Sequence, residues 1–384
     1  MKMKMTRGFA AASVLVVGVA LSTAGMTTSF AADTPPQDAH VTLMTPYLDA
    51  TNTSEAAANQ KMADGWVANG WFGTGVIYQR TFIPVSSTVN LTYHVTDKNG
   101  APLVNQKVKL RVNKGYSAST SIIQVDNIRT KGVDKPPADQ GTVFHTTDAF
   151  GNVTFAVKDL DQAPMGEPQP ETWTSKPNIS DDGLNDLHSQ MLLEVAGEKP
   201  DHSVFTEFHY YLPKNVSAPV ATHPTIKLVT PALDDKNSIS SGTNSRQVYA
   251  PTGSSIVVAY KVTDDNGAAY PDAAVKLKVG TATLTATSDA LGYAVFTIKD
   301  THTKGEPKPA TLTSPVPTSG GVFVTLKPEI TGASTDVADS LEVHYYGVPA
   351  KAAATATTIS CVKGSTTVKI NGVNPTCPKG YKKK

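Results

Sequence analysis

The chain contains an internal repeat, and this repeat constrains its fold more than any other feature. Four segments within residues 41–211 match four segments within 226–346, in the same order and each without a gap. Internal self-similarity of this kind is typical of tandem domains, because each copy is one structural unit. The matched pairs are 41–49 with 226–234, 89–101 with 256–268, 147–159 with 288–300, and 207–211 with 342–346.

Apolar and polar residues alternate inside the matched segments, which is the pattern of half-buried β-strands. The apolar positions of 89–95 fall on one face, and 256–262 repeat this alternation. Further strands are expected at 108–112 and 155–157 in the first copy, and at 275–279 and 296–298 in the second. We therefore expect an all-β protein with two tandem β-sandwiches, and about seven or more strands in the second copy.

Turn-forming residues separate these strands. Lys98-Asn99-Gly100 and Asp265-Asn266-Gly267 supply the Asn-Gly dipeptide that is favoured in tight hairpins. The segments 148–151 and 289–292 both begin with Asp and end with Gly. They predict further turns in which the glycine takes a positive φ.

Each copy has a strand that ends in Val-Thr-Asp-x-Asn-Gly, followed later by the pattern Thr/Ser-Asp-x-x-Gly-x-x-x-Phe. This combination resembles the bacterial immunoglobulin-like repeats of the invasin and intimin type. The resemblance covers about 41–213 and 226–349. It implies Ig-like β-sandwiches that stack as stalks and adhesive arms on bacterial surfaces, with no catalytic residues and no cofactor to carry over. The same turn signature also occurs in other bacterial sandwich domains, including some appended to enzymes.

The first 32 residues are expected to be an export signal. Lys2, Lys4 and Arg7 precede a short apolar stretch, and small residues at 29–32 offer a cleavage site. The apolar stretch is about 13 residues, short for a membrane span. A retained N-terminal anchor is the alternative, but we expect no transmembrane segment in the mature chain.

The expected organisation follows from the signal and the repeat. It comprises a signal peptide (1–32), an Ig-like sandwich with long insertions (33–213), a linker (214–225), a second Ig-like sandwich (226–349), and a linker with a basic tail (350–384).

The tail differs from the rest of the chain in charge. Residues 351–384 contain seven lysines and no acidic residue, whereas the remainder of the mature chain is acidic. Such a tail predicts attraction to an anionic polymer or to an acidic body. Contact with cell-wall polymer is assigned to Lys379, Lys382, Lys383 and Lys384, and a solubilising tail without a partner is the alternative.

Both cysteines of the chain, Cys361 and Cys377, lie in this tail. In an exported protein they predict one disulfide, which contributes roughly 3 kcal/mol by loop closure. A zinc site is disfavoured because it requires four Cys or His ligands. With an expected return strand at 367–370, the tail is predicted to be a small disulfide-closed, β-hairpin-like unit. It also resembles the Cys- and Lys-rich endings of many secreted actinobacterial proteins.

The first copy is longer than the second, and the extra residues carry its candidate binding site. Trp66, Trp71 and Phe72 lie among glycines in an expected exposed loop at 60–80. Insertions on a rigid sandwich are common binding sites. These aromatic rings are candidates for stacking on a glycan or on a surface protein. The alternative is that they cap the open end of the sandwich core.

Other chemistry is disfavoured. The acidic turns at 97–99 and 264–266 supply two or three oxygens, whereas calcium needs six to eight, so plain Asn-Gly turns are the preferred interpretation. Glu167 and Glu306 recur in Gly-Glu-Pro motifs without a partner carboxylate that would make them general acids. The lysine-rich tail lacks the aromatics and arginines of a nucleic-acid binder. We therefore expect no metal and no nucleic-acid partner.

The sequence thus predicts a secreted, cell-surface-associated bacterial protein without enzymatic activity, acting in adhesion or as a structural part of the envelope. Two rivals stay open. One is a carbohydrate-binding protein that uses the aromatic residues of the first copy, and the other is an enzyme of unrecognised type in that enlarged copy.

Overall fold

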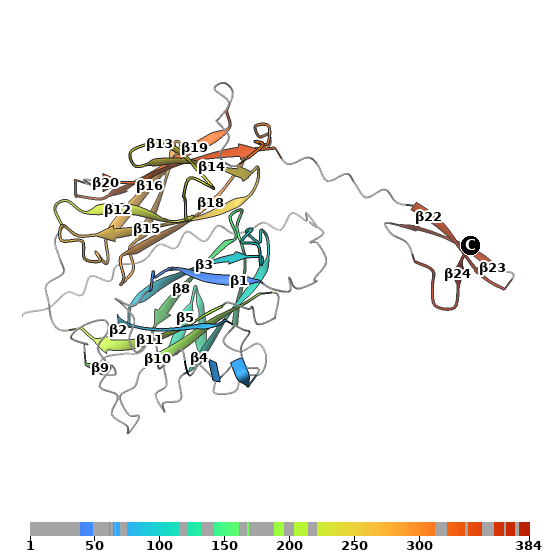
Figure 1. Cartoon of the computed structure of the whole chain (residues 1–384), viewed down its shortest axis with the longest axis horizontal. Helices are drawn as coiled ribbons and strands as arrows, with labels where there is room; N and C mark the ends of the chain where they lie inside the picture. Colours follow the sequence, from blue (N-terminus) through green and yellow to red (C-terminus); the bar gives the residue numbers. More distant parts are fainter. Residues whose placement is uncertain are drawn as a thin grey trace, which may run out of the picture. The chain divides into compact units, whose positions relative to one another are not determined.

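The structure is a computed structural model, and its labelled elements are β-strands (Figure 1). The predicted all-β class is confirmed. All strands fall within one compact unit, Pro35–Lys384. The structure describes residues 39–48, 61, 64, 65, 67–69, 75–114, 122–131, 142–160, 167, 168, 188–195, 203–213, 221–311, 321–334, 337–347, 357–364, 366–372 and 376–384. The predicted signal peptide lies outside these residues.

The strands of the first copy form two sheets. One has the order β1-β3-β8-β5-β6 and the other β2-β11-β10-β4-β7, with β9 also pairing with β11. The strands are β1 (His40–Thr45), β2 (Ile77–Pro84), β3 (Thr88–Thr96), β4 (Lys107–Lys114), β5 (Ile122–Val125), β6 (Ile128–Lys131), β7 (Thr142–Thr146), β8 (Asn152–Asp159), β9 (Glu167–Pro168), β10 (His188–Val195) and β11 (Val204–Leu212).

The second copy repeats this arrangement with fewer additions. Its sheets have the orders β18-β15-β12-β20 and β13-β14-β21-β19-β16-β17. The strands are β12 (Thr225–Thr230), β13 (Ile239–Gly242), β14 (Ser245–Pro251), β15 (Ser255–Thr263), β16 (Ala274–Val279), β17 (Ala282–Thr287), β18 (Tyr293–Lys299), β19 (Phe323–Ile330), β20 (Val337–Ala338) and β21 (Ser340–Tyr346).

The alternating residues form the two cores, as predicted. In β3 the apolar face is fully buried, and the equivalent face of β15 is buried in the same way. An edge-to-face ring pair recurs in both cores, between Tyr93 and Phe155 and between Tyr260 and Phe296. The repeat therefore corresponds to one packing scheme used twice.

The Asn-Gly turns differ from the prediction of tight hairpins within one sheet. Gly100 and Gly267 each take a φ of +81°, which fits the turn residues. After the first turn, however, only Thr96 and Pro102 form a bridge, and β4 then joins the other sheet. The turn lies at a corner where the chain crosses between the two sheets, because β4 pairs with β10 rather than with β3.

The predicted exposed loop at 60–80 is wrong in its second part. β2 begins at Ile77 and pairs with β11, and the side chains of Val76 and Tyr78 are buried. Nearer the start of the segment, the Asn69 N–H donates to the Gly65 carbonyl at 3.1 Å in a helical turn. The longer segment before β2 thus adds a small apolar cluster to the first sandwich. In this cluster Val67 packs against Tyr78 and its buried neighbours.

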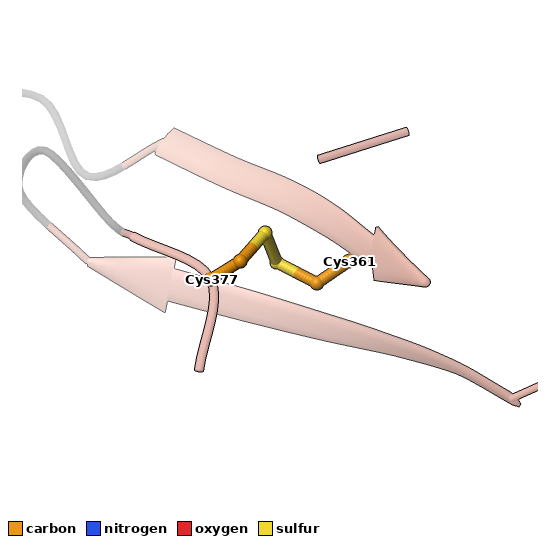
Figure 2. The surroundings of a disulfide bond; sticks show 2 residues. All are labelled: Cys361 and Cys377. Carbon is orange, nitrogen blue, oxygen red and sulfur yellow. A yellow bond between two sulfur atoms is a disulfide. The ribbon is translucent and has the colours of Figure 1, made fainter. Parts of the chain in front are cut away.

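The tail forms a separate three-stranded sheet with the order β23-β22-β24. Its strands are β22 (Thr357–Lys363), β23 (Thr366–Gly372) and β24 (Lys382–Lys383). Cys361 in β22 is bonded to Cys377, as Figure 2 shows, with a Cα–Cα distance of 5.6 Å. The predicted disulfide-closed hairpin is confirmed, and it carries a third strand.

Among the described residues, no helix has the length and apolar character that crossing a bilayer requires.

Candidate functional site

The described lysines of the tail are all exposed, and the pairing of its strands sorts them onto faces. Ser360 of β22 pairs with Lys369 of β23, and Val362 pairs with Lys382 of β24. The Lys384 N–H donates to the Ser360 carbonyl at 2.9 Å, which continues this register. Because side chains alternate across a strand, Lys369, Lys382 and Lys384 share one face of the sheet. We call this set the lysine face.

The remaining lysines lie elsewhere on the tail. Lys383 pairs with Cys361 and therefore belongs to the opposite face. Lys379 is exposed in the turn before β24. The Lys363 ammonium lies 5.9 Å from the centre of the Tyr381 ring. The structure thus separates the four lysines predicted to contact polymer, and adds Lys369, whose position in an alternating strand is the signal that would have identified it.

The predicted aromatic site cannot be assembled, since Trp66, Trp71 and Phe72 lie outside the described residues. The described part of the first sandwich contains a buried charged network that joins β2, β10 and β11. The Arg80 Nε–H donates to Glu207 Oε1 at 2.8 Å, and the Gln190 amide donates to Glu207 Oε2 at 2.7 Å. Sequence reasoning missed this network because its members are far apart in the chain.

His209 completes the network around Glu207. Its Nε2 lies 2.8 Å from Glu207 Oε1, and its ring stacks on His188 with centroids 5.2 Å apart. Burial alone would raise the pKa of Glu207, but His209, Arg80 and His188 together hold it well below its usual value. Burial, reinforced by the charge of Glu207, raises the pKa of the Tyr78 hydroxyl. Glu207 is therefore a buried anion paired with the Arg80 guanidinium.

The second sandwich contains a related network around His344. Its Nδ1 lies 2.9 Å from Glu306 Oε1 and its Nε2 lies 2.7 Å from Glu342 Oε1. Glu306 also accepts the Val322 N–H at 2.6 Å. The glutamate of this Gly-Glu-Pro motif thus ties a loop to the closing strand. Both networks join strands within a sandwich, which is a structural role.

The carboxylates of the acidic turns are engaged by their own backbones. Asp97 Oδ1 accepts the N–H groups of Asn99 and Ala101 at 2.8 and 2.9 Å. Asp264 Oδ1 makes the two equivalent bonds at 2.9 Å. These bonds favour the interpretation as plain turns. The described part of the chain contains no group of three or more His, Cys, Asp or Glu residues placed to hold a metal ion.

A shallow pocket of about 360 Å³ lies on the second sandwich, with Leu228, Asn244 and Arg246 in its wall. Arg246 donates from both terminal nitrogens to Asp235 Oδ1 at 3.1 Å. Asp339, also in the wall, accepts the Leu228 N–H at 2.8 Å. These charged groups of the wall are therefore engaged in hydrogen bonds within the second sandwich.

The fold defines the protein as a tandem of two immunoglobulin-like β-sandwiches followed by a disulfide-closed tail. No family model matches the chain, and no curated protein matches it either. Solved structures are similar to this chain at low sequence identity.

Three of these structures illustrate the range. Invasin, described as a bacterial integrin-binding protein, is 14% identical over 72% of this chain and 40% of its own, with a TM-score of 0.21. Domains 4–9 of surface layer protein SbsC are 12% identical over 76% and 32%, with a TM-score of 0.27. The fibronectin(III)-like modules of Clostridium thermocellum CbhA are 9% identical over 80% and 94%, with a TM-score of 0.19. Similarity at this level transfers no ligand and no activity.

Proposed function

We propose that this protein is an exported, non-enzymatic surface protein whose basic tail binds anionic polymer of a bacterial cell wall. In this role the two Ig-like sandwiches form the body that acts in adhesion or in the structure of the envelope. The observation that carries the proposal is the lysine face, in a segment of the chain without any acidic residue. The disulfide agrees with export, since such bonds persist in oxidising compartments.

The lysine face suits a polymer better than a single small anion. An exposed ion pair contributes only about 0.2–1 kcal/mol, so one lysine would not retain the protein. Three lysines held on one face of a sheet can contact successive charges of the same polymer. Their contributions then combine, because the second and third contacts form within one complex. Salt should weaken this binding, since the Debye length falls from about 10 Å at 0.1 M to about 3 Å at 1 M.

The test is retention on purified cell walls. We expect the triple variant Lys369→Gln, Lys382→Gln and Lys384→Gln to lose most of its retention at low salt. Wild-type protein should elute as the salt concentration rises. A matched control removes three exposed lysines from the second sandwich, by Lys227→Gln, Lys236→Gln and Lys276→Gln, and changes the net charge equally.

Equal losses in both variants would indicate a general charge effect and would contradict a tail-specific site. Retention that is unchanged in the tail variant, or indifferent to molar salt, would also exclude the proposal. Circular dichroism of each variant establishes that the sandwiches remain folded, so that a loss of retention reports on binding.

A further inference from the structure

The repeated Ser/Thr-Asp-Ala-x-Gly turn makes contacts that a turn alone does not need. In each copy the first oxygen of the Asp carboxylate closes the turn. Asp148 Oδ1 accepts the N–H groups of Phe150 and Asn152, and Asp289 Oδ1 accepts those of Leu291 and Tyr293. The second oxygen of each carboxylate points to the other copy.

These second oxygens make reciprocal bonds. Asp148 Oδ2 accepts the Val257 N–H of β15 at 2.6 Å, and Asp289 Oδ2 accepts the Asn90 N–H of β3 at 2.7 Å. Asn90 and Val257 are equivalent positions of the repeat. The next residue of each turn adds a matching bond. The Ala149 N–H donates to the Ser255 carbonyl and the Ala290 N–H to the Thr88 carbonyl, both at 3.1 Å.

The strand starts that receive these bonds extend beyond the pairing with their neighbours β1 and β12. β1 pairs with β3 only as far as Thr92, and β12 pairs with β15 only as far as Ala259. Beyond those points the backbone ladder with β1 or β12 ends, although the Thr45 hydroxyl of β1 still donates to the Asn90 carbonyl at 2.8 Å. The Asn90 and Val257 N–H groups and the Thr88 and Ser255 carbonyls bond to the other copy instead. The Asp-Ala pair of the other copy takes them up, as an added strand would.

Apolar side chains of the turns follow the same reciprocal pattern. Leu291 and Tyr293 of the second copy are buried in the core cluster of the first sandwich. Ala149 and Phe150 of the first copy pack against the core cluster of the second. Some contacts are one-sided, since the Tyr47 N–H donates to the Tyr293 hydroxyl at 3.0 Å. The shared part of the interface is therefore formed by backbone groups, the two aspartates and the equivalent apolar residues Phe150 and Leu291.

We propose that the Asp-Ala turn and the open strand start together form a homotypic docking surface, through which one Ig-like copy binds another. Each copy carries both halves, so the surface is self-complementary, as in an interface with two-fold symmetry. Within this chain the partner is the tandem neighbour, and both surfaces are then used. Once the internal pair is opened, the partner that fits is a second copy of this protein. This inference is independent of the role proposed for the tail.

The internal contact is tested by hydrogen exchange in the full chain. The double variant Asn90→Ala and Tyr293→Phe removes cross-copy side-chain contacts and leaves both aspartates in place. The reporter is the Val257 amide, whose acceptor Asp148 is unchanged. We expect its exchange to become about tenfold faster, because hydrogen bonds that hold the pair together are lost. The Val95 amide, bonded within the first sandwich, should not change.

The control variant Asn99→Ala and Tyr270→Phe alters the same residue types away from the contacts between the two copies, and should leave the Val257 amide protected. A Val257 amide that exchanges equally fast in wild type and in both variants would overturn the proposal.

Self-complementarity is tested by inserting a protease site between residues 213 and 221, cleaving the folded chain, and recording native mass spectra. We expect pairs of the first sandwich with the second and, less abundant, pairs of the second with itself. The substitution Asp289→Ala should reduce both kinds of pair. Free halves alone, or unlike pairs without any like pair, would show that the surface is not homotypic.

Discussion

At the scale of single residues, the two interface aspartates are the unusual groups of this protein. Burial raises the pKa of Asp148 and of Asp289 to about 6, although backbone N–H groups act in the opposite direction. The ammonium of Lys261 also lowers the pKa of Asp289, without cancelling the effect of burial. Each carboxyl therefore takes up a proton more readily in the folded protein than in the unfolded chain.

This shift predicts a pH dependence with a definite sign. A group whose pKa is raised on folding stabilises the protein at pH values below its unfolded pKa, and this contribution is lost as the pH rises through the folded value. We expect the free energy of unfolding of wild type, relative to Asp148→Asn, to fall by up to about 3 kcal/mol between about pH 4 and pH 7. Urea unfolding at a series of pH values measures it.

Asp97 is the matched control for this experiment. It is an aspartate of an equivalent turn motif, and the backbone N–H groups of Ala101 and Asn99 lower its pKa. Its contribution is present above the unfolded pKa and is lost as the pH falls. The variant Asp97→Asn should therefore differ from wild type with the opposite slope. The same slope for both variants would contradict the assignment of the shift to burial at the interface.

At the scale of elements, the turns before β8 and β18 depend on a glycine for two reasons. Gly292 takes a φ of +79°, and a Cβ atom there would lie 2.6 Å from the Val262 carbonyl oxygen. Gly267 has a similar φ of +81°, but its surroundings are open. We expect Gly267→Ala to cost about 1–2 kcal/mol of stability, from backbone conformation alone. Gly292→Ala should cost more, because the backbone must also move.

Thermal or urea unfolding of the two variants compares the cost of the backbone conformation alone with the cost of conformation and close contact together. Equal destabilisation by both substitutions would show that the close approach between Gly292 and β15 is relieved without cost. The comparison is a fair one because both glycines belong to the same sandwich and both have left-handed backbone conformations.

At the scale of the whole molecule, the tail and the sandwiches are separate sheets. Cys361 is buried in the tail sheet and forms the disulfide with Cys377. Replacing both cysteines by Ala removes a constraint worth roughly 3 kcal/mol to the tail. We expect the variant to lose wall retention while the unfolding transition of the sandwiches stays unchanged. Retention equal to that of wild type would show that the lysines bind without an ordered sheet.

Much of the fold could be predicted from local patterns. Alternation in 89–95 and 256–262 predicted the buried faces of β3 and β15, because successive side chains of a strand point to opposite sides. The glycines at 151 and 292 were predicted at positive φ for the same local reason. The disulfide could be predicted because the chain has only two cysteines. The aromatic site at Trp66, Trp71 and Phe72 stays a prediction.

The sequence by itself therefore determined the class, the repeat, the core faces and the closed tail, since these depend on residues near one another in the chain. The tertiary structure alone decided which sheet β4 joins after its turn, and that Arg80 meets Glu207. It also decided that the second oxygens of Asp148 and Asp289 bind strands of the other copy. These contacts join residues from 75 to 199 positions apart. Their partners are set by the packing of the sheets, which no local pattern records.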